Sequence, residues 1–168
     1  GYDKLYKLRP LIEYLNCSFK KHYAPTKEQA IDECMVKFKG RISYKQYMAQ
    51  KPVKRGFKIW VRADKKGYVC DFQIYTGKTD DKVEHNLGER VVLDLCKDLE
   101  GKGYHIYFDN FFTSVSLVEK LKLLSLPSCG TVRSNRKGVP VLKKDNELKR
   151  GEYDCQARSD GIVCVKWK

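Results

Sequence analysis

The aspartate at position 109 has the setting in this sequence that most directly suggests chemistry. It follows a short apolar segment in the stretch HIYFDNFFTS, His105 to Ser114, and stands just before a predicted helix start. A carboxylate at the end of a buried strand is costly unless it caps the turn, pairs with a cation or binds metal. Two roles are therefore open for Asp109: metal ligand, or cap of the helix that begins at Thr113 or Ser114.

A second acid, Asp32, lies in a predicted strand from Gln29 to Phe38. If this strand and that of Asp109 are adjacent and parallel, the two carboxylates converge at one end of the sheet. Magnesium takes oxygen ligands and holds phosphate substrates in such a place, so the pair predicts metal-assisted phosphodiester chemistry. The alternative is that Asp32 is a solvated acid at a strand start. Glu33 is expected to be solvated, because its side chain must face the other way.

Basic residues outnumber acidic ones, 34 to 21, and the net charge of +13 favours a polyanionic partner. A merely soluble basic protein is the alternative. Clustering favours nucleic acid, because Lys51 to Lys58 holds four cations and Arg133 to Lys144 holds five. The residues predicted to contact DNA phosphates are Lys51, Lys54, Arg55, Arg133, Arg136 and Lys137.

The first half of the chain reads as a helix followed by antiparallel strands. Apolar residues at helical spacing predict a helix from Pro10 to Lys20, and the segment Tyr23 to Glu28 reads as a linker to the Asp32 strand. Alternating residues from Phe57 to Ala63 and from Tyr68 to Tyr75, joined by the turn DKKG, predict a β-hairpin. Three antiparallel strands are expected here.

The second half alternates helices and strands. After the polar loop TGKTDDKVEHN, one apolar face predicts a helix from Leu87 to Leu99, and the Asp109 strand follows. A second helix is predicted from Ser114 to Leu124, capped by Thr113 or Ser114, and a fifth strand from Ser128 to Arg133. Residues Glu152 to Lys168 read as one more hairpin, with its turn at Ser159 to Gly161.

The order β-β-β-α-β-α-β predicts an α/β fold with a mixed five-stranded sheet and helices on its faces, which is the ribonuclease H-like order. The N-terminal helix and the C-terminal hairpin are extensions of it. Within this fold Asn110 and Thr113 are expected to be turn and cap residues. The aromatic residues around the Asp109 strand are expected to be packing residues: Tyr104, Tyr107, Phe108, Phe111 and Phe112.

Composition limits the class of protein. A chain of 168 residues with 42% hydrophobic and 12% aromatic residues can close the core of one globular domain. No apolar run is long enough to span a bilayer and the amino terminus lacks a signal peptide, so we expect a soluble intracellular protein. Seven scattered cysteines without a C-x-x-C pair predict neither a disulfide framework nor zinc binding, and most are expected to be reduced core thiols.

Five motif blocks resemble the DDE transposase domain of the piggyBac family, including its domesticated, transposable-element-derived relatives. They cover most of the sequence: IDECMVKFKGR, KQYMAQKPVKRGFKIW, GYVCDFQIYTGK, YFDNFFTS and GTVRSNR. The opening DKLYKLRPLIEYLN resembles the family's helical lead-in from a preceding dimerisation and DNA-binding domain. The resemblance implies a lead-in over residues 1–25, a ribonuclease H-like catalytic core over 26–135, and the beginning of an insertion domain over 136–168.

The resemblance also implies a site of three aspartates, with Asp32 in the place of the first and Asp109 in that of the second. In the family the third acid lies beyond the insertion. The acids near the end of this chain do not have a matching context: Asp145, Glu147, Glu152, Asp154 and Asp160. We therefore expect the chain to be a fragment of a longer protein and inactive by itself. The family's cysteine-rich zinc module has no counterpart here, so no zinc is expected in this chain.

The implied activity is cut-and-paste DNA transposition by phosphodiester hydrolysis and strand transfer. It would use two Mg²⁺ ions, or Mn²⁺ as substitute, about 3.5 to 4 Å apart. The implied partner is double-stranded DNA, at transposon ends and at target sites. A second copy of the protein could bind through domains missing from this chain. The implied location is the nucleus, and no membrane is involved. A domesticated domain that binds DNA or chromatin without cutting it is the alternative. A nuclease or RNA-binding domain of the same fold is disfavoured by the closeness of the motif blocks.

Overall fold

The computed structural model describes residues 3–77 and 84–168, which form a mixed sheet, three α-helices and a separate hairpin. The middle of the predicted loop TGKTDDKVEHN lies outside the described residues. The helical elements are η1 (Tyr6–Leu8), α1 (Arg9–His22), α2 (Leu87–Cys96), η2 (Lys97–Leu99), α3 (Val115–Leu123) and η3 (Asp145–Glu147). The strands are β1 (Glu28–Lys37), β2 (Gln46–Tyr47), β3 (Arg55–Asp64), β4 (Val69–Ile74), β5 (His105–Phe108), β6 (Ser128–Gly130), β7 (Tyr153–Ala157) and β8 (Val163–Trp167).

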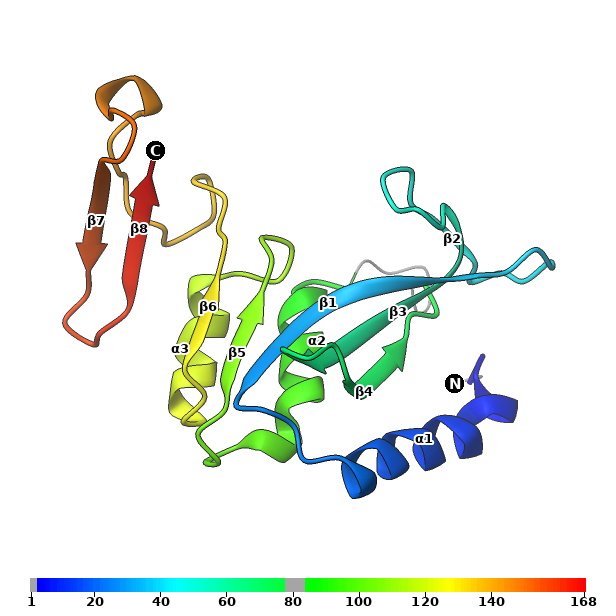
Figure 1. The fold of residues 1–168 in the computed structure, drawn as a ribbon. Coiled ribbons are helices and arrows are strands. Elements are labelled where there is room, and N and C mark those ends of the chain that lie inside the picture. Colours follow the sequence, from blue (N-terminus) through cyan, green and yellow to red (C-terminus); the bar gives the residue numbers. More distant parts are fainter. Residues whose placement is uncertain (1–2, 78–83) are drawn as a thin grey trace.

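The main sheet has the strand order β2-β3-β1-β5-β6, with β4 also paired to β3 (Figure 1). Strands β1, β3 and β4 are antiparallel, and β5 and β6 join parallel to β1 through helical crossovers. This confirms the predicted ribonuclease H-like order. The short strand β2 was not expected and makes the sheet six-stranded, while β6 ends at Gly130, earlier than predicted.

Helices α2 and α3 cover one face of this sheet and close the principal core. The odd-numbered residues of β1 and the even-numbered residues of β3 point to this face, so Ile31 and Trp60 pack there, each 1% exposed. The helices contribute Val92 and Leu117, among others, both fully buried. The predicted amphipathic helices are therefore confirmed, and Ser114 caps α3 by accepting a hydrogen bond from the Leu117 amide at 3.1 Å.

Helix α1 packs against strand β4 and contributes to a smaller apolar cluster, in which Ile12 lies near Phe57 and Phe72. Pro10 stands in its first turn, as predicted. The side chain of Asn16 accepts a hydrogen bond from the Phe72 amide at 3.2 Å and donates one to the Phe72 carbonyl at 3.1 Å. The helix thereby satisfies backbone groups of β4 with a side-chain amide.

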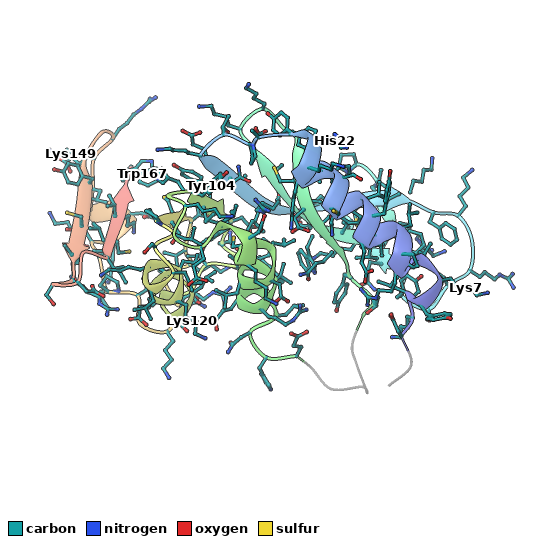
Figure 2. All side chains as sticks on the ribbon, turned by 90° about the horizontal axis from the view of Figure 1, so that it is seen from below. Lys7, His22, Tyr104, Lys120, Lys149 and Trp167 are labelled. Carbon is teal, nitrogen blue, oxygen red and sulfur yellow. The ribbon has the colours of Figure 1, made fainter. Side chains whose placement is uncertain are left out.

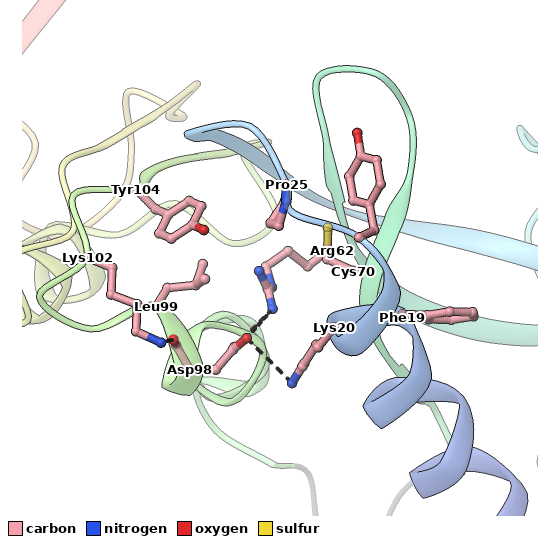
Figure 3. A pocket seen from close by; sticks show the side chains of 10 residues that line it. Phe19, Lys20, Pro25, Arg62, Cys70, Asp98, Leu99, Lys102 and Tyr104 are labelled. Atoms are coloured by element: carbon pink, nitrogen blue, oxygen red, sulfur yellow. Dashed lines mark hydrogen bonds and ion pairs between the residues drawn. The ribbon is translucent and has the colours of Figure 1, made fainter.

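A buried arginine joins α1, the sheet and η2 at the end of the sheet where β1 and β5 begin. Arg62, 1% exposed, donates to both carboxylate oxygens of Asp98 at 2.9 Å and to Gln29 at 3.0 Å. Lys20 of α1 completes the group through an ion pair with Asp71 at 2.5 Å between nitrogen and oxygen. Lys20, Arg62 and Asp98 border a cavity of about 190 Å³, whose other walls include Leu99 and Tyr104 (Figure 3).

The β7–β8 hairpin stands apart from the main sheet, at the opposite end of the molecule from α1 (Figure 2). Its pairs Tyr153–Trp167 and Cys155–Val165 present apolar side chains on one face, and Trp167 is 74% exposed. The hairpin itself confirms the sequence prediction. It is tied to α3 by an ion pair of Arg158 with Glu119, 2.6 Å between nitrogen and oxygen.

The cysteines correct one expectation. All seven are free thiols, but only Cys70 and Cys96 are buried, whereas Cys17, Cys34, Cys129 and Cys155 are exposed. Burial raises the pKa of Cys96 to about 12. Most of the thiols therefore lie at the surface, on sides of their helices and strands that no other described element covers. In the described ranges no helix is long and apolar enough to cross a membrane.

Candidate active site

The parallel pairing of β1 with β5 brings Asp32 and Asp109 to one end of the sheet. Ile31 is the register partner of Phe108, and each acid is the next residue along its chain. The predicted adjacency of the two strands is thus confirmed. Asp32 lies inside β1, between Ile31 and Glu33, and not at a strand start as the alternative interpretation had it. Both acids are exposed to solvent.

Asp109 organises a tight turn between β5 and α3. Its Oδ1 accepts the Phe111 amide at 2.9 Å, and its carbonyl oxygen accepts the Thr113 hydroxyl at 2.7 Å and the Thr113 amide at 3.2 Å. The alternative prediction, that Asp109 caps the following helix, is wrong because Ser114 takes that position. One carboxylate oxygen therefore supports the turn, and Oδ2 has no hydrogen bond within the part of the chain that the structure describes.

Asp32 sits in a mixed electrostatic environment. Partial desolvation at the sheet end raises the pKa of its carboxyl, and the negative charge of Glu33 adds to this rise. A hydrogen bond from the Glu33 amide to Oδ1, at 2.7 Å, and the charge of Lys51 act in the opposite direction but do not outweigh it. The ionised form of Asp32 is therefore less favourable than that of a freely solvated aspartate.

Glu33 departs from the expectation of a solvated acid. Its side chain is only 12% exposed, and its Oε1 lies 3.0 Å from the Nζ of Lys51. Trp60 is its cross-strand partner, so the carboxylate leaves β1 on the helix-covered face. Alternation along β1 correctly put Glu33 on the face opposite Asp32, but the expectation that this side chain is solvated is wrong, because Lys51 from a distant loop covers it.

Two lysines accompany the acids. The hydrogen bond to Glu33 raises the pKa of Lys51, and the charges of Asp32 and Asp109 raise it further. The same acids act to raise the pKa of Lys58, but burial outweighs them and lowers this pKa overall. Both ammonium groups are therefore within electrostatic reach of Asp32 and Asp109. Lys58 was predicted only as a member of a basic cluster, and its packing could not be read from that cluster.

The second basic segment holds the Asp109 turn from outside. Arg136 donates to the carbonyl oxygens of Asn110 at 2.9 Å and Phe111 at 3.0 Å, and Arg133 donates to the Asn110 side chain at 3.2 Å. These two arginines therefore support the turn, which qualifies their predicted role as phosphate contacts. Lys137, next along the chain, is exposed. Asn110 and Thr113 are turn residues as predicted, and neither caps α3.

The remaining predicted DNA-contacting residues lie on the loop before β3 and at its start. Lys54 and Arg55 are exposed, and the Arg55 guanidinium lies 5.2 Å from the centre of the Tyr47 ring. Because the Nζ of Lys58 lies 5.2 Å from the centre of the Phe111 ring and Arg136 donates to the Phe111 carbonyl, both basic segments adjoin the same turn. The structure thus brings together two regions that are far apart in the sequence.

Aromatic side chains pack next to the charged residues of the site. Phe111 stacks on Trp60, with ring centres 5.4 Å apart, and Phe112 meets both rings edge-on. The expected packing role is confirmed for Phe108 and Phe112, which are buried, whereas Tyr107 and Phe111 are 41% and 40% exposed. Tyr107 lies on the uncovered face of β5, which explains its exposure.

Comparison with known proteins agrees with this architecture. The family model described as "Transposase IS4" matches residues 1–168. The human PiggyBac transposable element-derived protein 3 is 36% identical over 173 residues, and the human PiggyBac transposable element-derived protein 2 is 36% identical over 175. Each alignment covers 98% of this chain but 29% of the relative, so the chain spans less than a third of their length.

A solved structure is similar as well. It is described as the cryo-EM structure of a piggyBac transposase synaptic complex with hairpin DNA, and it matches with a TM-score of 0.73 and 26% sequence identity. The match covers 94% of this chain and 36% of that one. The chain belongs to the Transposase IS4 family and is a transposase-derived domain of the piggyBac family.

Proposed function

We propose that this domain binds duplex DNA and supplies two of the acids for divalent-metal-dependent hydrolysis and strand transfer at a DNA phosphodiester. The observation that carries the proposal is the register of β1 and β5, which brings Asp32 and Asp109 to one sheet end. Two carboxylates beside a basic surface suit a phosphate substrate and a hard cation.

The donor chemistry fits Mg²⁺ or Mn²⁺ in part. Asp32 and Asp109 are exposed carboxylates that would hold the ion, and Oδ2 of Asp109 is not used by the turn. Such an ion would supply Lewis-acid polarisation of the phosphodiester and activation of the attacking hydroxyl. Among residues 3–77 and 84–168 no three His, Cys, Asp or Glu side chains are grouped to hold a metal ion. We therefore expect weak binding by this chain, with the third acid elsewhere in the longer protein.

The other residues of the site set the charge around the acids, hold the turn that carries Asp109 and offer contacts to DNA. Lys51, anchored by Glu33, adds positive charge near Asp32 and Asp109 and so offsets part of their negative charge. Arg136 fixes the turn that carries Asp109. Exposed Lys54, Arg55 and Lys137 offer phosphate contacts around this centre.

The partner is proposed from charge and from the structural relative. The chain carries a net charge of +13, and the similar solved structure is described as a complex with hairpin DNA. We propose nuclear DNA as the partner, at transposon ends and target sites for a whole transposase. A homodimer formed through other domains is part of this proposal.

The test is binding of a fluorescein-labelled 20-base-pair duplex of arbitrary sequence, followed by anisotropy between 50 and 250 mM NaCl. We expect binding that weakens steeply with salt, because each neutralised phosphate releases counterions. We also expect no cutting with Mg²⁺ or Mn²⁺. Undetectable or salt-independent binding would contradict the DNA proposal. Cleavage that Asp32→Ala abolishes would overturn the expectation that the third acid lies outside this chain.

A domain that binds DNA or chromatin without cutting it is the second candidate. It is favoured by the human relatives, which are named as transposable element-derived proteins. The two candidates differ at the acids: Mn²⁺ binding that depends on Asp32 and Asp109 supports the metal-dependent function. DNA binding without any such metal binding supports the second candidate.

A further inference from the structure

Lys58 occupies an unusual position beside the turn that follows Asp109. Its side chain is half-buried, and its Nζ lies 3.9 Å from the centre of the Trp60 ring and 5.2 Å from that of Phe111. These two rings are stacked on each other, with an angle of 21° between their planes. The ammonium group is therefore held at the edge of the core by aromatic faces.

The rings do not replace a carboxylate partner. Within the part of the chain that the structure describes, the Lys58 side chain forms no ion pair and donates no hydrogen bond. Lys51, a few residues earlier, has its Nζ 3.0 Å from Glu33. A lysine ammonium has three N–H donors, and contact with aromatic faces gives none of them an oxygen acceptor. The donor capacity of Lys58 is largely unused.

The location of this unused donor is informative. The charges of Glu33, Asp109 and Asp32 act to raise the pKa of Lys58 and the charge of Lys51 acts to lower it, and none of these groups forms a described ion pair with Lys58. Phe111, one of the two rings, belongs to the turn that Asp109 organises. A half-buried cation that lacks a direct partner costs hydration free energy, and an anionic ligand bound beside the Asp109 turn would recover it.

We propose that Lys58 is a phosphate-binding residue, which contacts a non-bridging oxygen of a DNA phosphodiester bound beside the Asp109 turn. The proposal rests on the proposed DNA-binding function of this site. The stacked rings of Trp60 and Phe111 hold the ammonium near its working position, so that little side-chain entropy is lost on binding. Lys58 thereby differs from Lys54 and Arg55, which are exposed and suited to looser contacts.

The first test compares Lys58→Met, Lys58→Arg and the control Lys66→Met in DNA binding. Lys66 is an exposed lysine in the turn between β3 and β4, at the other end of β3. We expect Lys58→Met to weaken binding of the labelled duplex about tenfold, as loss of one charge-assisted hydrogen bond would. The slope of log affinity against log salt should become shallower by about 0.9. Lys58→Arg should keep most of the wild-type slope, and Lys66→Met should equal the wild type.

The second test uses the ring contact itself. The chain has two tryptophans, Trp60 and Trp167, so Trp167→Phe leaves Trp60 as the only reporter. Because the ammonium lies over this ring, transfer of its contact to a phosphate should change Trp60 emission when DNA is added. The change should disappear in the Trp167→Phe/Lys58→Met variant. Thermal melting of each variant establishes that the fold is retained.

The outcomes separate this proposal from the broader one. If the wild-type chain fails to bind DNA, the proposed function fails and Lys58 has no phosphate to contact. If the wild type binds with the expected salt dependence but Lys58→Met has the same affinity and slope, the Lys58 proposal alone is wrong. A lowered melting temperature with an unchanged slope would assign Lys58 a purely structural role and would also overturn the proposal.

Discussion

Ile31 of β1 pairs in parallel register with Phe108 of β5, and this one pairing places the candidate acids that follow them at the same sheet end. Side chains alternate along a strand, so a slip of one residue would carry Asp32 to the opposite face. The burial of Ile31, at 1% exposure, makes such a slip costly. The core therefore sets the geometry of the site.

Neutral substitution of either acid is expected to have little effect on stability. Asparagine in Asp109→Asn can still accept the Phe111 amide, and Asp32→Asn removes the repulsion with Glu33. Exposed substitutions of this kind change the free energy of unfolding by about 0.5 kcal/mol or less, roughly 1 to 2 °C in melting temperature. We expect Asp32→Asn to be neutral or slightly stabilising in thermal melts. A fall of more than about 5 °C in Asp109→Asn would mean that the carboxylate serves mainly to hold the turn.

The ion pairs of Arg62 and Arg9 should differ strongly in their contribution to stability. Arg62→Met leaves the carboxylates of Asp98 and Asp71 without their buried partner, which costs about 3 kcal/mol or more. Arg9→Met removes a pair with Asp3 in which both side chains are well exposed, and it should cost less than about 1 kcal/mol. Urea denaturation of both variants tests the difference. Equal losses would show that the Arg62 cluster is not a stabilising connection between α1, the sheet and η2.

Asp64 predicts a pH-dependent contribution to stability. Burial acts to raise the pKa of this 3% exposed carboxyl, but hydrogen bonds from Tyr23, Tyr68, Thr26 and Lys66 outweigh it and lower the pKa. Because folding lowers this pKa, the ionised Asp64 stabilises the folded state above the unfolded-state pKa of about 3.9. This stabilisation is lost as the pH falls through the folded-state pKa.

The variant Asp64→Asn should therefore lose about 1 to 2 kcal/mol at pH 7, since it keeps the acceptor oxygen but loses the charge. The difference in the free energy of unfolding between wild type and variant should decrease as the pH is lowered from 6 to 3, as measured by denaturant titrations. Asp145→Asn, at an exposed residue paired with Lys166, is the control. A difference in the free energy of unfolding that increases toward low pH would contradict the stabilising role of the ionised Asp64.

The location of positive charge predicts which lysines and arginines matter for DNA. Arg133→Ala/Lys137→Ala and Lys65→Ala/Lys66→Ala remove the same charge, the first pair near the Asp109 turn and the second at the β3–β4 turn. We expect the first double variant to weaken binding uniformly across DNA sequences and to flatten the salt slope by up to about one unit for each phosphate that is no longer neutralised. The second should bind like the wild type. Equal weakening would indicate that net charge alone drives binding.

Local patterns predicted the regular elements well because each carries its own periodicity. The alternation in β3 and β4 and the apolar stripes of α2 and α3 are visible in the sequence, and the crossover rule then gives the parallel neighbours of β1. β2 escaped prediction because two residues carry no periodicity.

The side-chain partners in the site could not be predicted, because each depends on contacts between distant segments. Glu33 is shielded by Lys51 from the loop before β3, and Lys58 lies over Phe111 from the turn after β5. Strand register is needed before either pair can be proposed. The sequence placed Asp109 correctly at the end of its strand and offered Thr113 or Ser114 as the cap of α3, and the structure assigns this cap to Ser114.

The most direct test of the two-acid site is Mn²⁺ binding by the 168-residue chain, followed by the decrease of the free-ion electron paramagnetic resonance signal. We expect weak binding, with a dissociation constant on the order of 0.1 to 1 mM, because two carboxylates and water make an incomplete site. Asp32→Asn and Asp109→Asn should each abolish it, whereas Asp145→Asn, away from the sheet end, should not. Mn²⁺ binding that is unchanged in Asp32→Asn and Asp109→Asn would contradict the assignment of this sheet end as the metal site.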